Sequence, residues 1–222
     1  MKTMPKTILF DLDGTLLDSL NDLWASVNHS LAQNNMSVRS KEEIRQFLGN
    51  GARQLISLSM PPGYSDKEFS QVYNEFKTYY SLHSSDKTKP YDGIMPMLEQ
   101  LKQLGVKTGI VSNKPDTAVQ KLYRRFFSNS IDMAIGEQEG ITRKPSPDMI
   151  FKALSILGSD VSQSIYVGDS EVDIATANNS GIKCISVSWG FRGRSYLENE
   201  GASTIVDDPT ELINLLKDIH FC

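Results

Sequence analysis

The pattern of hydrophobic and polar positions divides the chain into two kinds of region. Residues 7–10 form a short β-branched and aromatic run that ends at two aspartates, which is typical of a buried strand. From about residue 18 to residue 84, hydrophobic side chains recur at helical spacing and no strand pattern interrupts them. Three serines, each followed three residues later by an acid, predict capping boxes at helix starts: Ser19 with Asp22, Ser40 with Glu43 and Ser65 with Glu68.

Beyond a polar linker at residues 81–90, strand and helix patterns alternate up to the last helix, which opens at Asp208 and Pro209. Strands are predicted at residues 107–111, 131–135, 164–167, 182–187 and 204–206. Helices are predicted at residues 94–104, 115–127, 147–157 and 173–180. Such alternation is produced by βαβ units, which build a mainly parallel sheet with helices on both faces.

Together, the two regions predict an α/β fold: a doubly wound, mainly parallel, Rossmann-like sheet with an inserted all-helical cap. The sheet domain would comprise residues 1–15 and 88–222, and the cap residues 16–87. Since ligands bind at the carboxyl ends of strands in open α/β sheets, we expect the cap to lie over the end of the first strand. Hinges are expected at residues 16–18 and 81–90, where the chain passes between the two parts.

The composition narrows the class of protein. The 222 residues are 39% hydrophobic and 23% charged, which excludes a collagen-like repeat, a long disordered tail and a disulfide-dense mini-protein. The net charge of -4 disfavours nucleic acid and anionic membranes as partners. Cys184 and Cys222 do not make a disulfide framework, and the apolar run at residues 8–10 is too short for a signal peptide or a spanning helix. We therefore expect a cytoplasmic protein, and nothing in the sequence indicates its oligomeric state.

Two carboxylates follow the first strand, at Asp11 and Asp13, and Gly14 after them permits a sharp turn. Their spacing of two residues places both on the same side of the chain. The pKa values of carboxylates held close together separate unless a cation lies between them, which suits one group to nucleophilic attack and the other to proton transfer. Taken alone, a turn that only ends the strand is the alternative interpretation.

Two short motifs at later positions point to phosphate binding. Ser112 and Asn113 follow a predicted strand and precede a helix, where a hydroxyl and free main-chain amides bind anionic oxygens. Lys144, held next to Pro145, would neutralise an attacking carboxylate and a phosphoryl oxygen together. Ordinary helix capping and a solvated basic loop are the alternatives for these two motifs taken singly.

A further motif is acidic. Asp169 and Asp173 are one helical turn apart at a strand-to-helix junction, so both carboxylates can face the same point. Such oxygen ligands suit Mg²⁺, which usually takes one or two protein carboxylates beside waters and substrate phosphate. First-turn acids favoured by the helix dipole are the alternative. Because all these motifs lie at the carboxyl ends of successive predicted strands, we expect them to meet in one cleft.

Taken together, the motifs resemble those of the haloacid dehalogenase superfamily of phosphatases. DLDGTLLDS at residues 11–19 resembles its first motif, Ser112 its second, Lys144 its third and GDSEVD at residues 168–173 its fourth. The resemblance covers nearly the whole chain, including the helical insertion. Three further segments are similar to the phosphoglycolate phosphatase group: GNGAR at residues 49–53, SNKP at residues 112–115 and VSWGF at residues 187–191.

This resemblance implies a Mg²⁺-dependent phosphomonoester hydrolase whose substrate is a small phosphorylated metabolite, with phosphoglycolate as the best single candidate. It implies that Asp11 attacks phosphorus to form an aspartyl-phosphate. It also implies that Asp13 protonates the leaving oxygen and then activates the hydrolytic water.

The resemblance also assigns the remaining motif residues. It implies that Mg²⁺ is held by Asp11, by the main-chain carbonyl of Asp13 and by Asp169, with Asp173 supporting the metal shell or Lys144. It implies that the residues binding the transferring phosphoryl group are Ser112, the Asn113 amide and Lys144.

Substrate choice is expected to depend on the cap, where Asn50 and Arg53 lie on a glycine-bracketed segment. Arg53 would pair with a substrate carboxylate, and an exposed helix arginine is the alternative. The leucine and aromatic rows of the cap are expected to be core. A pyrophosphatase or a sugar-phosphate mutase is an alternative activity on the same machinery, and a non-catalytic binding module is an alternative that the proton-transfer role of Asp13 disfavours.

Overall fold

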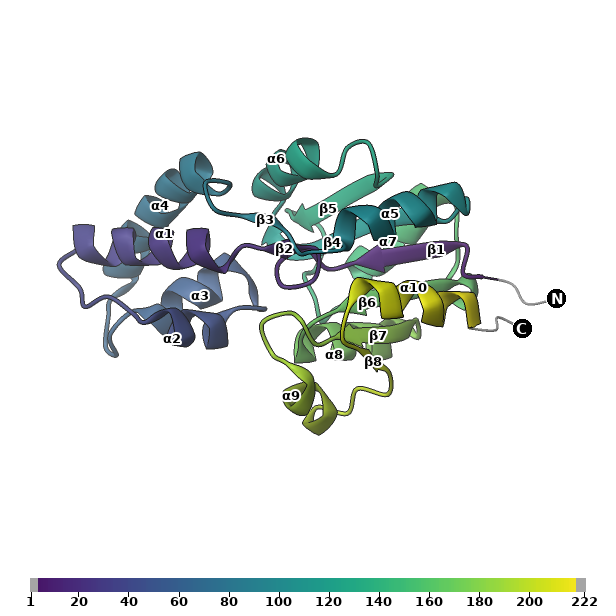
Figure 1. Ribbon diagram of the computed structural model, residues 1–222. Coiled ribbons are helices and arrows are strands. Elements are labelled where there is room, and N and C mark those ends of the chain that lie inside the picture. The colour runs from purple at the N-terminus through teal and green to yellow at the C-terminus, as the bar shows by residue number, and fades with distance from the viewer. Residues whose placement is uncertain (1–3, 219–222) are drawn as a thin grey trace.

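The computed structural model describes residues 4–218, and its centre is a six-stranded sheet (Figure 1). The strand order is β5-β4-β1-β6-β7-β8, and each pair of neighbouring strands is parallel. The strands are β1 (Thr7–Phe10), β4 (Lys107–Pro115), β5 (Met133–Glu137), β6 (Ser164–Gly168), β7 (Lys183–Val187) and β8 (Ile205–Val206). The prediction of an α/β fold with a doubly wound, mainly parallel sheet is confirmed.

Alternating side chains of the central strands supply two hydrophobic cores. Ile8 and Phe10 of β1 belong to one core and Leu9 to the other, as the two-residue repeat of a strand requires. The helices of the first core are α5 (Ile94–Gln103), α6 (Asp116–Phe126) and α10 (Pro209–Asp218). Those of the second core are α7 (Asp148–Leu157) and α8 (Glu171–Ser180). Because both faces of β1 are covered, its apolar residues form an unbroken run rather than an alternating pattern.

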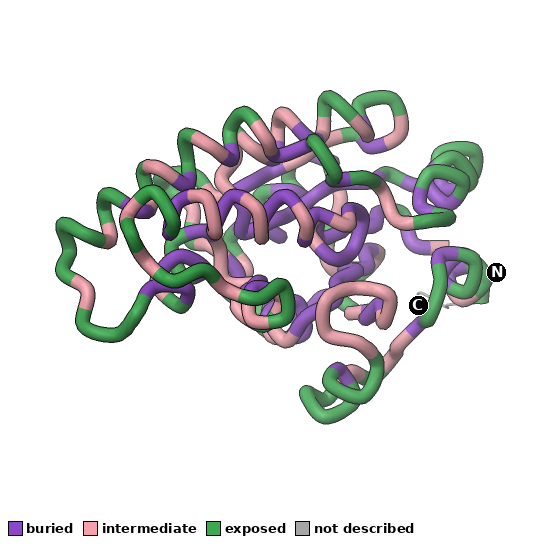
Figure 2. Tube along the Cα trace, turned by 60° about the vertical axis from the view of Figure 1, so that its left-hand side comes forward, coloured by how far each residue is buried: buried purple, intermediate pink, exposed green. Residues whose placement is uncertain are grey.

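Four helices between β1 and β4 form a separate lobe, drawn at the left of Figure 1. They are α1 (Leu20–Gln33), α2 (Lys41–Phe47), α3 (Gly51–Ser59) and α4 (Asp66–His83). Their inward faces share a core of their own, which includes Val27, Leu31, Ile44, Ile56 and Phe76. Figure 2 shows buried positions recurring between exposed ones along these helices, as the helical spacing of hydrophobic residues predicts. We call these four helices the helical lobe.

Two extended segments connect the helical lobe to the sheet. β2 (Leu17–Asp18) pairs antiparallel with β3 (Lys89–Pro90). Of the predicted linker at residues 81–90, the first residues belong to α4, which continues to His83, and the last two form β3, which was not predicted. Strands of two residues are too short to show an alternating pattern in a sequence.

Two other short segments were not predicted. They are a 3₁₀ turn at Val161–Gln163 and α9 (Arg194–Asn199). Each is shorter than two helical turns, so its hydrophobic positions cannot define a helical repeat.

The structure corrects one of the three predicted capping boxes. The boxes at Ser40 and Ser65 are present. Ser19 precedes α1, but its hydroxyl makes no cap hydrogen bond and donates instead to Asp13 Oδ1, at 2.5 Å. The box predicted for Ser19 with Asp22 is therefore wrong, because a carboxylate from the turn after β1 competes for the serine hydroxyl.

Asp22 joins the two segments that connect the lobe to the sheet. Its buried carboxylate accepts hydrogen bonds from the main-chain N–H groups of Lys87 (3.0 Å) and Thr88 (2.8 Å), and from the Thr88 hydroxyl (2.8 Å). Hydrogen bonds to an ionised acceptor are stronger than those between neutral groups. The start of α1 is thereby held against the chain that returns to the sheet.

The structure adds to what the composition indicated about membrane-spanning segments and about cysteines. Among residues 4–218, no helix combines the length and the apolar character that crossing a bilayer requires. Cys184 carries a free thiol, and burial raises its pKa to about 12, so the thiol stays protonated near neutral pH. Cys222 lies outside the described residues.

We predict that Asp22→Ala lowers the free energy of unfolding by about 2–4 kcal/mol, because two N–H groups and one hydroxyl lose their buried acceptor. Asn21→Ala is the matched control on the same helical turn, since the Asn21 side chain accepts only an exposed hydrogen bond from Lys41. That variant should change stability by less than about 0.5 kcal/mol. Urea unfolding of both variants measures the difference, and equal stabilities would contradict the role given to Asp22.

Candidate active site

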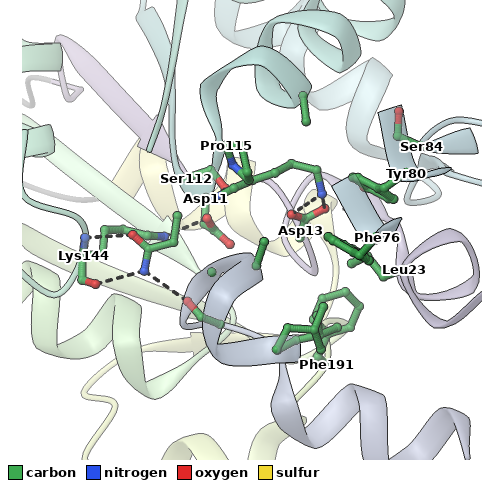
Figure 3. Close-up of a pocket in the computed structure, with 18 of the residues that line it drawn as sticks. Asp11, Asp13, Leu23, Phe76, Tyr80, Ser84, Ser112, Pro115, Lys144 and Phe191 are labelled. Atoms are coloured by element: carbon green, nitrogen blue, oxygen red, sulfur yellow. Dashed lines mark hydrogen bonds and ion pairs between the residues drawn. The ribbon is translucent and has the colours of Figure 1, made fainter. Parts of the chain in front are cut away.

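The carboxyl ends of the central strands open onto a pocket between the sheet and the helical lobe. Its volume is about 250 Å³, and its sheet side is lined by Asp11, Asp13, Ser112, Lys144 and Asp169. In Figure 3, Asp11, Ser112 and Lys144 lie together on one side of the pocket. The structure thus brings together residues that four separate sequence motifs supply.

Lys144 is the centre of the hydrogen-bond network in this pocket. It is 2% exposed, and its Nζ donates to Asp11 Oδ1 (2.7 Å), to Asp173 Oδ1 (2.8 Å) and to the Tyr166 hydroxyl (2.8 Å). Burial opposes the positive charge, but Asp11 and Asp173 together hold the pKa of Lys144 above its ordinary value. Lys144 is therefore a fixed positive charge in contact with Asp11.

Both carboxylate oxygens of Asp173 are committed to donors of the protein. Oδ1 accepts from Lys144 and Tyr166, each at 2.8 Å. Oδ2 accepts from the Ser170 hydroxyl (2.7 Å) and from the main-chain N–H groups of Ser170 (3.1 Å) and Asp169 (3.2 Å). Burial acts to raise the pKa of Asp173, but Lys144 and the other donors hold it below the ordinary value. Asp173 therefore stays ionised and orients Lys144.

Asp169 occupies a space that two glycines leave open. A Cβ atom on Gly14 would lie 2.2 Å from Asp169 Oδ2, and one on Gly190 would lie 2.4 Å from Asp169 Cβ. Oδ2 accepts a hydrogen bond from the main-chain N–H of Phe191 at 2.7 Å, and Oδ1 accepts a longer one from the Thr15 hydroxyl at 3.4 Å. Gly14 also has a φ of +90°, so the turn after β1 requires glycine both for its conformation and for the room it leaves.

The three buried acids form a group that fits a divalent cation. Asp11, Asp169 and Asp173 each offer a carboxylate oxygen, and these oxygens lie within 4.8 Å of one another. Burial raises the pKa of Asp11 to about 7 and that of Asp169 well above its ordinary value, and the charge of Asp173 adds to both shifts. One lysine faces three carboxylates, so the group carries an excess of negative charge. Oxygen ligands suit Mg²⁺, and Asp11 and Asp169 have carboxylate oxygens to offer it, whereas Asp173 is committed to Lys144.

Lys114 is a pocket residue that the sequence analysis missed. Its buried ammonium donates to both carboxylate oxygens of Asp13, at 2.7 and 2.8 Å, and lies 4.8 Å from the centre of the Tyr80 ring on α4. Although burial opposes its charge, Asp13 raises the pKa of Lys114 above the ordinary value. The strand predicted to end at Val111 continues as β4 to Pro115, and this extension buries Lys114. Its position directly after the Ser-Asn pair is the one signal that the sequence offered.

Ser112 and Asn113 are both buried, but their side chains are engaged differently. The Ser112 hydroxyl lines the pocket and accepts a long hydrogen bond from the main-chain N–H of Lys114, at 3.3 Å. The Asn113 carboxamide donates to the main-chain carbonyls of Lys144 (2.9 Å) and Gly49 (3.2 Å), and accepts from the Lys144 N–H (2.8 Å). The Asn113 side chain therefore holds the Lys144 segment and a loop of the helical lobe.

Asn50 and Arg53 do not line the pocket, although their neighbours Gly49, Gly51 and Ala52 do. Arg53 is exposed, and its guanidinium lies 4.8 Å from the ring centre of Phe69 and 5.2 Å from that of Tyr73. Asn50 precedes α3 and makes no side-chain cap hydrogen bond. The lobe side of the pocket is lined instead by leucine and aromatic residues that were expected to be core: Leu23, Leu48, Leu55, Phe76 and Tyr80.

Comparison with known proteins places this site in a family. A model of the haloacid dehalogenase-like hydrolase family matches residues 8–187. The chain belongs to this family. The matched segment runs from β1 to the end of β7, so it contains each of the acids and lysines described above.

Relatives of the chain are phosphatases with different named substrates. The chain is 31% identical over 220 residues to the phosphoglycolate phosphatase of Pseudomonas syringae pv. syringae, covering 95% of this chain and 79% of that protein. It is 30% identical over 213 residues to the N-acetylmuramic acid 6-phosphate phosphatase of Pseudomonas aeruginosa, covering 95% and 94%. A crystal structure from Lactobacillus delbrueckii subsp. bulgaricus, provisionally named a phosphoglycolate phosphatase, matches with a TM-score of 0.91 and 36% identity, covering 96% and 99%. The protein is therefore a phosphatase.

We predict that Gly14→Ala lowers kcat by about 100-fold or more, because the new Cβ atom must displace the Asp169 carboxylate. Gly63→Ala is the matched control, since Gly63 also has a positive φ, +87°, but a Cβ atom added there would meet no other atom within 4 Å. Steady-state hydrolysis of p-nitrophenyl phosphate with Mg²⁺ compares the two variants. A similar loss in both, or full activity of Gly14→Ala, would show that the space beside Asp169 is not required.

Proposed function

We propose that this phosphatase is a Mg²⁺-dependent phosphomonoester hydrolase that works through an aspartyl-phosphate at Asp11. The observation that carries the proposal is the contact between Lys144 and Asp11, at 2.7 Å, with Asp173 holding the lysine from the other side at 2.8 Å. Oδ1 of Asp11 is thus anchored, and within the described residues no donor binds Oδ2. A carboxylate with one oxygen anchored and the other free in a pocket has the geometry that a nucleophile needs.

In this proposal five side chains share the steps of the reaction. In the first step the protonated form of Asp13 is required: Oδ2 of Asp11 attacks phosphorus, and the bond from phosphorus to the ester oxygen breaks as protonated Asp13 gives its proton to that oxygen. Water then attacks phosphorus, Asp13 accepts a proton from it, and Asp11 leaves as a carboxylate with release of inorganic phosphate. Lys144 offsets negative charge on Asp11 and on the phosphoryl group in both steps. Lys114 and Ser19 position Asp13 through hydrogen bonds to its carboxylate.

The pocket supports both the cation and the phosphoryl group. The residues that would hold Mg²⁺ are Asp11, the main-chain carbonyl of Asp13 and Asp169. When bound, the ion supplies positive charge that neutralises phosphoryl oxygens and aligns them for attack. Asp173 supports this site by fixing Lys144. The Ser112 hydroxyl, which lines the pocket, and the Asn113 main-chain N–H would bind a phosphoryl oxygen.

We also propose that the substrate is a small phosphorylated metabolite, with phosphoglycolate as the first compound to test. The pocket volume of about 250 Å³ lies below the range of about 300–1,000 Å³ that is common for drug-sized ligands. A small ester therefore suits the pocket better than a phosphorylated amino sugar. Relatives named phosphoglycolate phosphatase support the same choice. In this proposal residues 16–87 act as a cap, since side chains of α3 and α4 line the pocket opposite the sheet.

We expect that removal of divalent ions by EDTA abolishes hydrolysis of p-nitrophenyl phosphate and that Mg²⁺ restores it. The physical reason is that Asp11 and Asp169 face each other with one lysine as the neighbouring cation, so a dianionic phosphoryl group entering the pocket meets uncompensated charge. Titration calorimetry of the metal-free protein with MgCl₂ gives the affinity independently of turnover. Undiminished hydrolysis in excess EDTA would contradict the metal requirement.

We expect that Asp11→Asn lowers kcat by about 1,000-fold or more while the protein stays folded, because an amide of the same shape cannot attack phosphorus. Asp132→Asn is the matched control: Asp132 accepts a hydrogen bond from the Thr108 N–H and does not line the pocket. Circular dichroism melting verifies the fold of both variants before their kinetics are compared. Wild-type turnover in folded Asp11→Asn would exclude Asp11 as the nucleophile.

A further inference from the structure

The hydroxyl groups of Tyr80, in α4, and of Ser84, directly after α4, line the pocket without an acceptor for their O–H protons. Tyr80 is 5% exposed and Ser84 is 0% exposed, and among residues 4–218 neither hydroxyl donates a hydrogen bond, although the Lys114 ammonium is close enough to Tyr80 Oη to act on its pKa. In Figure 3, Tyr80 lies beside Asp13, and Ser84 lies one turn further along the helix. Since buried hydroxyls are paired in most proteins, these two require a partner that the chain does not provide.

Positive charge surrounds this end of the pocket. Lys114 lies against the Tyr80 ring, and its own charge is met by Asp13. Lys121 of α6 donates to the Ser81 carbonyl at 2.6 Å, and Lys77 lies 4.9 Å from the centre of a neighbouring tyrosine ring. Lys77 and Lys121 both line the pocket, and within the part of the chain that the structure describes neither is paired with a carboxylate. The end of the pocket formed by α4 and α6 therefore combines two O–H groups with unbalanced positive charge, which fits an anion.

The pocket wall beside these hydroxyls is apolar, and this restricts the kind of molecule that can carry the anionic group. Leu23, Leu55 and Phe76 line the lobe side of the pocket and offer no hydrogen-bonding side chain. Asp13, the proposed proton donor to the ester oxygen, is bound to Lys114, and Lys114 in turn contacts Tyr80. Since Lys114 contacts both Asp13 and Tyr80, a leaving group of few carbon atoms would reach from Asp13 to the two hydroxyls.

We propose that Tyr80 and Ser84 donate hydrogen bonds to a carboxylate on the leaving group of the substrate. The proposal rests on the proposed phosphomonoester hydrolysis and deepens it, since it names the substrate class as small phosphorylated carboxylic acids. A carboxylate accepts hydrogen bonds from both hydroxyls at once and gains from the nearby ammonium groups. Substrate selection is thereby assigned to Tyr80 and Ser84 rather than to Arg53. Arg53 is exposed and does not itself line the pocket, and its guanidinium packs on Phe69 and on the pocket residue Tyr73.

Three esters of matched size test the assignment in the Mg²⁺-loaded enzyme: phosphoglycolate, 2-hydroxyethyl phosphate and ethyl phosphate. They differ only in the group on the carbon next to the ester oxygen, which is a carboxylate, a hydroxymethyl or a methyl group. Wild-type enzyme should hydrolyse phosphoglycolate with a kcat/KM about tenfold or more above that of ethyl phosphate, because a hydrogen bond to a charged group contributes about 1.5–3 kcal/mol, which is about 10-fold or more.

The variants Tyr80→Phe and Ser84→Ala should each raise the KM for phosphoglycolate by about tenfold and leave kcat/KM for ethyl phosphate within about twofold. Ser84→Thr keeps the hydroxyl and should retain the preference for the carboxylate. Tyr79→Phe is the matched control, because Tyr79 stacks between His29 and His83 and does not line the pocket. A role of the hydroxyls in lobe stability alone would lower activity on all three esters together, and that result would overturn the proposal.

The outcomes separate this inference from the proposed function. Equal efficiency on phosphoglycolate and ethyl phosphate, or a preference for 2-hydroxyethyl phosphate, overturns the carboxylate assignment while hydrolase activity stands. A loss of the phosphoglycolate preference in Arg53→Met, with Tyr80→Phe and Ser84→Ala unaffected, overturns it in favour of Arg53. Absence of Mg²⁺-dependent turnover on these esters and on p-nitrophenyl phosphate contradicts the proposed function itself.

Discussion

The pocket depends on one buried ion-pair network, in which Lys144 lies between Asp11 and Asp173. An ammonium that is 2% exposed keeps its charge only where carboxylates contact it, and a buried carboxylate is equally dependent on its partner. The partners come from different elements, since Asp11 follows β1 and Asp173 lies in α8. These elements must therefore be correctly placed before the network can form, which makes the site a consequence of the whole sheet.

The two ends of the pocket carry opposite charge, and this difference suits them to different ligand groups. On the sheet side, three acids and one lysine leave negative charge that a divalent cation would neutralise. At the end of the pocket formed by α4 and α6, Lys77 and Lys121 leave positive charge beside the hydroxyls of Tyr80 and Ser84. Reaction and recognition are thus assigned to opposite ends of one small cavity, and the Asp13–Lys114 pair lies between them.

Long-range contacts decide where the sequence could not predict the structure. Strand-end motifs located Asp11, Ser112, Lys144 and Asp169, because parallel strands bring their carboxyl ends to one edge of the sheet. The extension of β4 to Pro115 depends on pairing with Glu137 of β5, which no local pattern reveals, so Lys114 was missed. The predicted cap at Ser19 failed for the same reason, because its hydroxyl donates a hydrogen bond to Asp13 instead of capping its own helix.

In the helical lobe, the sequence predicted the helices but not which of their side chains line the pocket. Helical periodicity predicted its elements, yet a row of hydrophobic and aromatic positions looks the same whether it faces a core or a pocket. Tyr80 belongs to the core of the lobe and lines the pocket as well, and Ser84 at the end of α4 carries no sequence signal of its own. Arg53 attracted attention by its charge, whereas the structure packs it on aromatic rings.

The covalent step at Asp11 is tested most directly by reductive trapping during turnover. Borohydride converts an aspartyl-phosphate to homoserine, and mass spectrometry of the tryptic peptide of residues 7–39 locates the change, since that peptide contains Asp11, Asp13, Asp18 and Asp22. We predict homoserine at position 11 when the enzyme is quenched with Mg²⁺ and phosphoglycolate present, and aspartate there without substrate. Homoserine at another position, or unmodified Asp11 under full turnover, would contradict the account.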